Sequence, residues 1–264
     1  MFGNRRRTVF GVIVLVAGVM CSTALAAGAD EEEAQASALP APSVAVDATW
    51  NGKYVWRGIN VVDGSVLQPS ATIGWGGLSA NVWGNMDLSN VNGQSADFTE
   101  YDLTLDYSWA LDSLGFSVGS IYYTFPHSDV PSTAEVYAGA GLDIPLSPSL
   151  TVYQDVDEAD GTYSSLSVGH TFEGILVLAD GVAVSADLGA SIAHGSSNFN
   201  DFYYGSDSSG LTDSLFSLSL PVSLGEYVSV APAAHYSSLL DDDIRDSMSD
   251  DDNFWAGITL SCSF

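Results

Sequence analysis

Alternation between apolar and polar side chains, repeated along the chain, is the feature that most constrains its fold. The stretch 97–109 is the clearest case. Its apolar face holds Tyr101, Leu103, Leu105, Tyr107 and Trp109, and its polar face holds Glu100, Asp102 and Asp106. A period of two is typical of a β-strand. Three carboxylates exclude the polar face from the dry core of a soluble sheet. The pattern predicts a transmembrane β-strand with its apolar face toward lipid and its polar face toward water.

Segments of this kind follow one another from residue 43 to the C-terminus. They cover 43–57, 66–75, 78–88, 97–109, 114–125, 133–144, 149–158, 161–173, 181–194, 211–223, 226–238 and 253–264. Their number is even, and most long polar connections alternate with short ones, as in bacterial barrels. We therefore expect an all-β fold, a transmembrane antiparallel up-and-down β-barrel of about 12 strands. A soluble secreted β-sandwich is the less favoured alternative. The connection Glu173 to Asp180 departs from the pattern, because it is apolar and long for a periplasmic turn.

The first 42 residues differ from the rest. Residues 1–26 predict a secretory signal peptide, with basic Arg5–Arg7, an apolar run and the cleavage site Ala24-Leu25-Ala26. Residues 27–42 are rich in Ala, Glu and Pro and predict a flexible periplasmic lead. Residues 43–264 form the predicted barrel. Its last residue, Phe264, is a terminal aromatic of the kind that the barrel-assembly machinery receives, so we expect this machinery and outer-membrane lipid as partners.

Basic residues are scarce after the signal peptide. Lys53, Arg57 and Arg245 remain against 33 acidic residues, a net charge of −30. This charge excludes nucleic acid as a partner. Lys53 and Arg57 fall on the polar face of the first predicted strand, whereas Tyr54 and Trp56 fall on its lipid face. A guanidinium in an acidic lumen should pair with carboxylates.

The candidate lumen residues are charged side chains predicted to face the barrel interior. They are Lys53, Arg57, Glu100, Asp102, Asp106, Glu135, Asp143 and Asp155. An excess of carboxylates in an open lumen favours cations over anions. Arg57 has two candidate roles: a brace that neutralises the inner wall, or part of a constriction that sorts solutes.

Aromatic side chains divide between the two faces. Interface girdles are predicted for Trp50, Trp56, Trp75, Tyr101, Trp109 and Tyr236. Trp83 and Trp255 fall on polar faces instead, where they would fill the lumen or stack on a ligand.

The last long connection is strongly acidic around Arg245. Its aspartates are Asp241, Asp242, Asp243, Asp250, Asp251 and Asp252. Clustered carboxylates suit loosely bound Ca²⁺ or Mg²⁺, although the spacing lacks the central Gly of an EF-hand. A solvated acidic loop is the alternative. No other cofactor is predicted. The four histidines are far apart and no phosphate loop or zinc spacing occurs, so we predict no enzymatic activity.

Three motifs carry a resemblance to a known family. They are Tyr54-Val55-Trp56-Arg57-Gly58, Leu67-Gln68-Pro69-Ser70 and Leu78-Ser79-Ala80-Asn81-Val82-Trp83-Gly84. With them, most of the span 43–264 resembles the TorF-type porins of Gram-negative outer membranes. The resemblance implies the barrel fold and the outer-membrane location more firmly than it implies transport.

Two functions follow from these expectations. The first is a porin that gives passive diffusion of small cationic or neutral solutes through an acidic lumen. The second is a closed structural or surface-interaction barrel with acidic extracellular loops and no open pore. A lumen filled by Trp83, Tyr137, Tyr153 and the ion pairs of Arg57 would favour the second.

Overall fold

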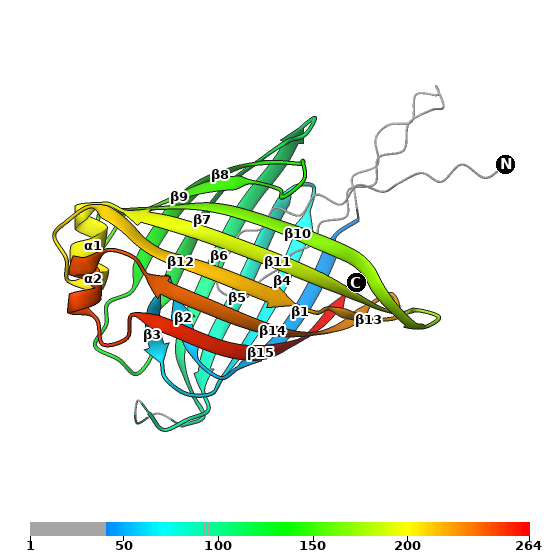
Figure 1. The fold of residues 1–264 in the computed structure, drawn as a ribbon, viewed down its shortest axis with the longest axis horizontal. Helices are drawn as coiled ribbons and strands as arrows, with labels where there is room; N and C mark the ends of the chain where they lie inside the picture. Colours follow the sequence, from blue (N-terminus) through cyan, green and yellow to red (C-terminus); the bar gives the residue numbers. More distant parts are fainter. Residues whose placement is uncertain (1–40, 92, 94) are drawn as a thin grey trace.

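A computed structural model describes residues 41–91, 93 and 95–264. The predicted signal peptide, and all of the predicted lead except its last two residues, lie outside the described residues. Thirteen of the described strands form one antiparallel sheet that closes on itself (Figure 1), and the other two form a separate hairpin. Among the described residues, no helix is long and apolar enough to cross a membrane.

The barrel has twelve strand positions, and each strand pairs with the next along the chain. They are β1 (Ser43–Asn51), β4 (Val66–Trp75), β5 (Leu78–Asp87), β6 (Asp97–Leu111), β7 (Leu114–Thr124), β8 (Thr133–Leu142), β9 (Ser149–Asp155), β10 (Thr162–Ala179), β11 (Val182–Gly195), β12 (Gly210–Ser219) with β13 (Val222–Leu224), β14 (Val228–Leu239) and β15 (Asp252–Ser263). β12 and β13 share one position, because both pair with β11 and β14. Pairing of β1 with β15 closes the barrel.

The alternation separates the outside of the barrel from the inside. In β6, Leu103 and Leu105 are 46% and 53% exposed, whereas Glu100 and Asp102 are 6% and 9% exposed. Exposed apolar side chains recur on strands all around the barrel. A surface of this kind suits lipid and not water. The predicted transmembrane barrel is therefore confirmed as the fold class.

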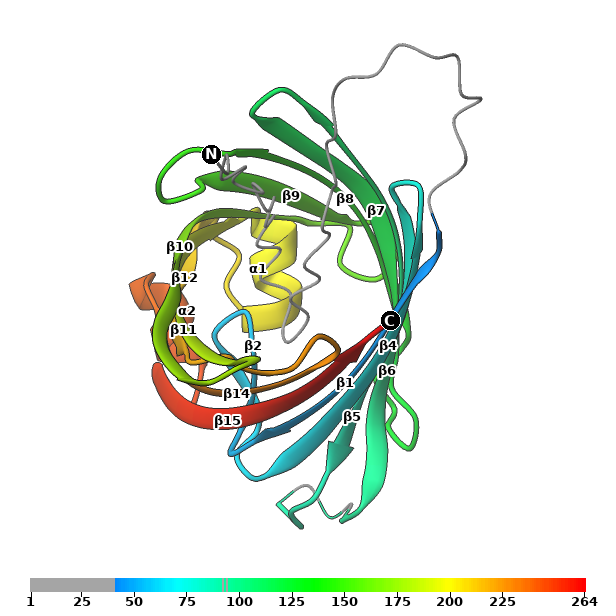
Figure 2. The same ribbon diagram turned by 90° about the vertical axis from the view of Figure 1, so that its right-hand side faces the viewer.

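The two ends of the barrel differ. The end that we call the loop end carries the long connections, with the hairpin of β2 (Tyr54–Trp56) and β3 (Ile59–Val62), α1 (Ser197–Tyr204) and α2 (Asp242–Ser247). The opposite end, the turn end, has short turns, and there the backbones of Val44 and Phe264 bond to each other. Seen from the turn end, α1 and the β2–β3 hairpin lie within the outline of the barrel (Figure 2). In barrels of this class the long loops are extracellular.

The prediction that the first strand runs from 43 to 57 is wrong beyond Asn51. β1 ends there, and the chain turns inward as the separate β2–β3 hairpin. Arg57 and Gly58 have φ values of 49° and 82°, as a tight type I′ hairpin turn requires. Tyr54 is 3% exposed and Trp56 is partly buried, so neither side chain faces lipid. The alternation of β1 continues into the hairpin, which is why the two appeared as one strand.

The prediction that Glu173 to Asp180 is a connection is also wrong. β10 continues to Ala179, and the turn comprises only Asp180 and Gly181. β9 pairs with β10 only as far as Ser167 of β10, so the remainder of β10 pairs with β11 alone. The register shifts between Phe172 and Leu176. This irregularity interrupts the alternation, because extra residues in one strand change which face the next side chains occupy.

Candidate functional site in the barrel lumen

The hairpin turn places Arg57 inside the loop end of the barrel. A Cβ atom on Gly58 would lie 2.6 Å from Leu239 Cδ2 and 3.0 Å from Asp213 Cβ, so the turn fits only with glycine there. The hydroxyl of Tyr204, on α1, donates a hydrogen bond to the carbonyl oxygen of Arg57 at 2.8 Å. The side chain of Asn253 donates to the carbonyl of Gly58 at 3.4 Å. The wall and α1 together therefore fix the turn.

The Arg57 side chain forms a bidentate ion pair with Glu135 of β8. Nη1 lies 2.7 Å from Oε1 of the carboxylate, and Nη2 lies 2.7 Å from Oε2. The hydroxyl of Tyr123 donates a third hydrogen bond to Glu135, at 2.9 Å. The Arg57 and Glu135 side chains are 9% and 0% exposed. Bidentate geometry of this kind is the strongest form of a charge-assisted hydrogen bond, and a buried charge needs such a partner.

Aromatic rings surround the same guanidinium. Its Cζ atom lies 4.2 Å from the ring centre of Tyr163, 4.5 Å from that of Trp56, 4.8 Å from that of Tyr153 and 5.3 Å from that of Phe199. Rings at this range attract a cation, more strongly where water is excluded. The four rings come from β10, β2, β9 and α1. Arg57 thus joins the hairpin and α1 to the barrel wall, and we call the hairpin (residues 54–62) and α1 the plug.

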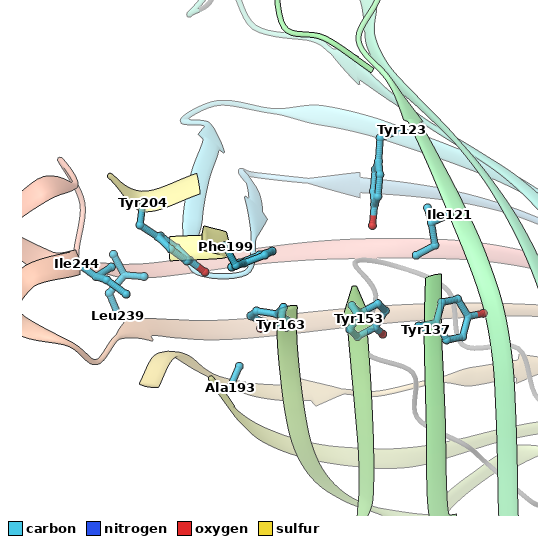
Figure 3. Close-up of a cluster of buried hydrophobic side chains, with 10 residues drawn as sticks. All are labelled: Ile121, Tyr123, Tyr137, Tyr153, Tyr163, Ala193, Phe199, Tyr204, Leu239 and Ile244. Carbon is cyan, nitrogen blue, oxygen red and sulfur yellow. The ribbon is translucent and has the colours of Figure 1, made fainter. Parts of the chain in front are cut away.

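A row of tyrosines on the inner wall supports the plug. Tyr137, Tyr153 and Tyr163 are direct register partners on β8, β9 and β10, and their ring centres are 5.5 Å and 6.2 Å apart. Phe199 of α1 continues the row 5.3 Å from Tyr163. Figure 3 shows these rings side by side, with Tyr204 beyond Phe199. The lumen at this end is therefore filled by aromatic side chains.

Tyrosine hydroxyls donate hydrogen bonds to further carboxylates of this region. Tyr137 donates to Asp106 at 2.7 Å. Tyr203 donates to Asp155 at 3.0 Å, and Tyr163 donates to Asp213 at 3.0 Å. Buried acidic groups keep their charge only when such donors replace water.

The predicted lumen residues are brought together only in part. Arg57, Glu135 and Asp155 meet at the loop end, where Glu135 and Asp155 are register partners. Lys53 forms an ion pair with Asp63 at 2.7 Å. Asp143 follows β8 in a turn at the turn end, away from this group. The remaining three, Glu100, Asp102 and Asp106, lie on the inner face of β6.

In the acidic connection between β14 and β15, several aspartates each have a separate hydrogen-bond or ion-pair partner. Asp241 caps α2 by accepting from the backbone nitrogens of Asp243 and Ile244. Asp251 forms an ion pair with Arg245 at 2.9 Å. Asp250 accepts from Asn60, and Asp252 accepts from Tyr236. In the described part of the chain, no three His, Cys, Asp or Glu side chains are arranged to hold a metal ion. The suggestion of Ca²⁺ or Mg²⁺ binding gains no support from this geometry.

The plug helix and Asp213 are functional candidates that sequence reasoning missed. α1 has only eight residues, too few for a clear helical period. Its ends do carry signals, because Ser196 accepts a hydrogen bond from the Phe199 backbone as N-cap and Gly205 adopts a left-handed C-cap conformation. Asp213 lies in a predicted strand, on the face opposite Phe216, and could have been added to the lumen set on that ground.

Alkaline conditions should leave the plug closed. Burial lowers the pKa of Arg57, but the Glu135 charge and hydrogen bonds more than offset this, so its pKa lies well above its ordinary value. Burial, with Glu100 near Tyr54 and Asp213 near Tyr204, raises the pKa of both phenols well above 10. A raised pKa gives stability that is lost only when pH rises through the folded value. We therefore expect the rate of tryptic cleavage after Arg57, corrected for trypsin activity, to stay constant from pH 7 to about pH 10. A rise within that window would contradict the assignment.

Comparisons with known proteins agree with the barrel fold. The structure of the NanC porin is similar with a TM-score of 0.50 at 10% identity, covering 83% of this chain and 98% of that one. An outer membrane channel from Pseudomonas putida F1 aligns with a TM-score of 0.45 at 10% identity, covering 89% of this chain and all of that one. No protein-family model and no curated protein sequence matches the chain. The likeness to NanC extends over the barrel as a whole, so this chain has the fold of an outer-membrane porin.

Proposed function

We propose that the protein is an outer-membrane porin of the TorF type, which passes small cationic or neutral solutes through an acidic lumen. The plug closes the loop end at rest, and solutes pass when it moves. The charge on the inner wall is the observation that carries this proposal. Inward-facing carboxylates recur on the strands, as Asp47, Asp87, Glu100, Asp102, Asp106, Glu135, Asp155, Asp187 and Asp213.

The positive charge of Arg57 does not offset this excess for a passing solute. Its guanidinium is already neutralised by Glu135 and enclosed by rings. A wall with many carboxylates and no free cation concentrates cations and repels anions. Arg57 therefore holds the plug in place and does not provide a binding site for anions.

A closed barrel with a structural or surface role is the second candidate. The filled lumen favours it, since Trp83, Tyr137 and Tyr153 are 5%, 7% and 4% exposed. Such rings leave no wide path while the plug is seated. The two candidates differ in whether the plug ever leaves this position.

Reversal potentials in planar bilayers test the porin proposal. With a KCl gradient across the membrane, we expect brief openings whose reversal potential indicates preference for K⁺ over Cl⁻. Asp106→Asn combined with Asp187→Asn should reduce this preference, because both side chains line the inner wall. Asp129→Asn, which changes an exposed loop carboxylate, is the matched control and should not alter it. Openings that prefer Cl⁻ would contradict the proposal.

A further inference from the structure

Two buried carboxyl groups in the lumen have no basic partner. The described chain contains three basic residues, and each is already paired: Lys53 with Asp63, Arg57 with Glu135 and Arg245 with Asp251. Glu100 and Asp102 lie two residues apart on the inner face of β6, 6% and 9% exposed. No salt bridge of the described residues involves either of them.

The two carboxyl groups are also neighbours on one face of a strand. Side chains at positions i and i+2 leave β6 on the same side, with their Cα atoms about 7 Å apart. The Oδ1 atom of Asp102 is buried and has no hydrogen-bond partner among the described residues. Two carboxylates this close repel each other strongly away from water, so a positive charge, either a proton or a cation, must lie with them. A proton shared between the two groups is the alternative to a bound cation.

Aromatic side chains accompany the pair. Trp83 is the register partner of Asp102 on β5 and is itself 5% exposed. The ring centre of Tyr54 lies 5.7 Å from that of Trp83. Asn85, the register partner of Glu100, is already bonded to Gln68 and Thr99. The polar groups nearby are therefore in use, while rings and carboxylates remain available to a cation.

We infer that Glu100, Asp102, Tyr54 and Trp83 form a binding site for a primary ammonium group. Such a group has three N–H donors, enough to reach Glu100 and the bare Asp102 Oδ1 together. Its charge is attracted by tyrosine and tryptophan rings. Two carboxyl groups are few for a divalent ion, which prefers six or more oxygen ligands or keeps most of its water. The inference rests on the proposed function only in that the lumen must admit cations.

Ligand-dependent stability of the folded barrel tests this site without any need for ion current. Unfolding in urea at pH 8 is followed for the refolded barrel in detergent, with methylammonium chloride replacing N-methyl-D-glucamine chloride at constant ionic strength. A ligand that binds the folded state alone raises the unfolding midpoint in a concentration-dependent way. We expect a saturating rise with methylammonium, and a smaller rise or none with tetramethylammonium, which has no N–H donor.

Variants locate the effect. Glu100→Gln/Asp102→Asn should abolish the methylammonium shift, Trp83→Leu should reduce it, and Asp129→Asn should retain it. Folding of each variant is checked by its migration on gels before and after boiling. If the double variant does not fold, Glu100→Gln alone replaces it in the same measurement.

Three results would overturn the assignment of an ammonium site. The first is an unfolding midpoint that does not respond to methylammonium, and the second is an equal response in the double variant. The third is a midpoint that changes with pH but not with methylammonium, which would identify a shared proton. Loss of conductance in bilayers with the methylammonium shift intact would contradict the porin proposal but not this site.

Discussion

Replacing Glu135 with alanine should release the plug and expose Arg57 to trypsin. The change leaves a guanidinium that is 9% exposed without its carboxylate. Breaking a buried ion pair by removing one partner costs about 3–5 kcal/mol. If this cost falls on the seated state of the plug, the open population rises by roughly a hundredfold to a few thousandfold.

Trypsin is a selective reporter of this opening. After residue 26 the chain contains three basic residues, Lys53, Arg57 and Arg245, and all of them belong to connections at the loop end. The measurement is the rate at which the fragment beginning at Gly58 appears. When opening and closing are fast relative to cleavage, this rate follows the open population.

Two further variants separate plug release from general damage. Glu226→Ala removes an exposed carboxylate from a turn and should leave the rate unchanged. Arg57→Met/Glu135→Ala removes both charges, so no unpaired charge stays buried, and its urea midpoint should lie above that of Glu135→Ala alone. An unchanged cleavage rate in Glu135→Ala would show that the ion pair does not hold the plug.

The strands of the barrel could be predicted because successive residues of a strand face lipid and the lumen alternately, which makes apolar and polar residues alternate in the sequence. β6 is the plainest example, since its carboxylates and its leucines alternate without interruption. Where this alternation breaks, prediction failed. In β10 the register shift after Phe172 placed apolar residues out of phase, so a strand resembled a connection. At Asn51 the opposite happened, because alternation continued into a hairpin that lies inside the barrel.

The candidate site could be predicted in its chemistry but not in its geometry. Pairing of Arg57 with a carboxylate followed from the shortage of basic residues. The choice of Glu135 depends on how far the hairpin reaches into the lumen, which depends on the I′ turn and on α1 packing beside it. Contacts between Trp56 and Tyr203, whose ring centres are 5.0 Å apart, join residues 147 positions apart in the chain. No local pattern encodes such a contact.

Removing the β2–β3 hairpin should convert brief openings into a steady current. Asn51 and Val66 are direct register partners, so an Asn-Gly turn in place of residues 52–65 can close β1 onto β4. All nine pairs between the two strands are retained, and with them the barrel. The change removes Trp56, Arg57 and the turn that Tyr204 contacts, so α1 loses its attachment on that side.

The current of this variant decides between the two candidate functions. The control replaces the exposed residues 128–131 with the same Asn-Gly pair, which shortens a loop at the same end without touching the plug. Both proteins must migrate differently before and after boiling, as a detergent-resistant barrel does. If the hairpin variant conducts steadily and prefers K⁺, the lumen is a pathway that the plug closes. If it folds and carries no current, the aromatic row of Tyr137, Tyr153 and Tyr163 seals the barrel by itself, and a structural role is the better account.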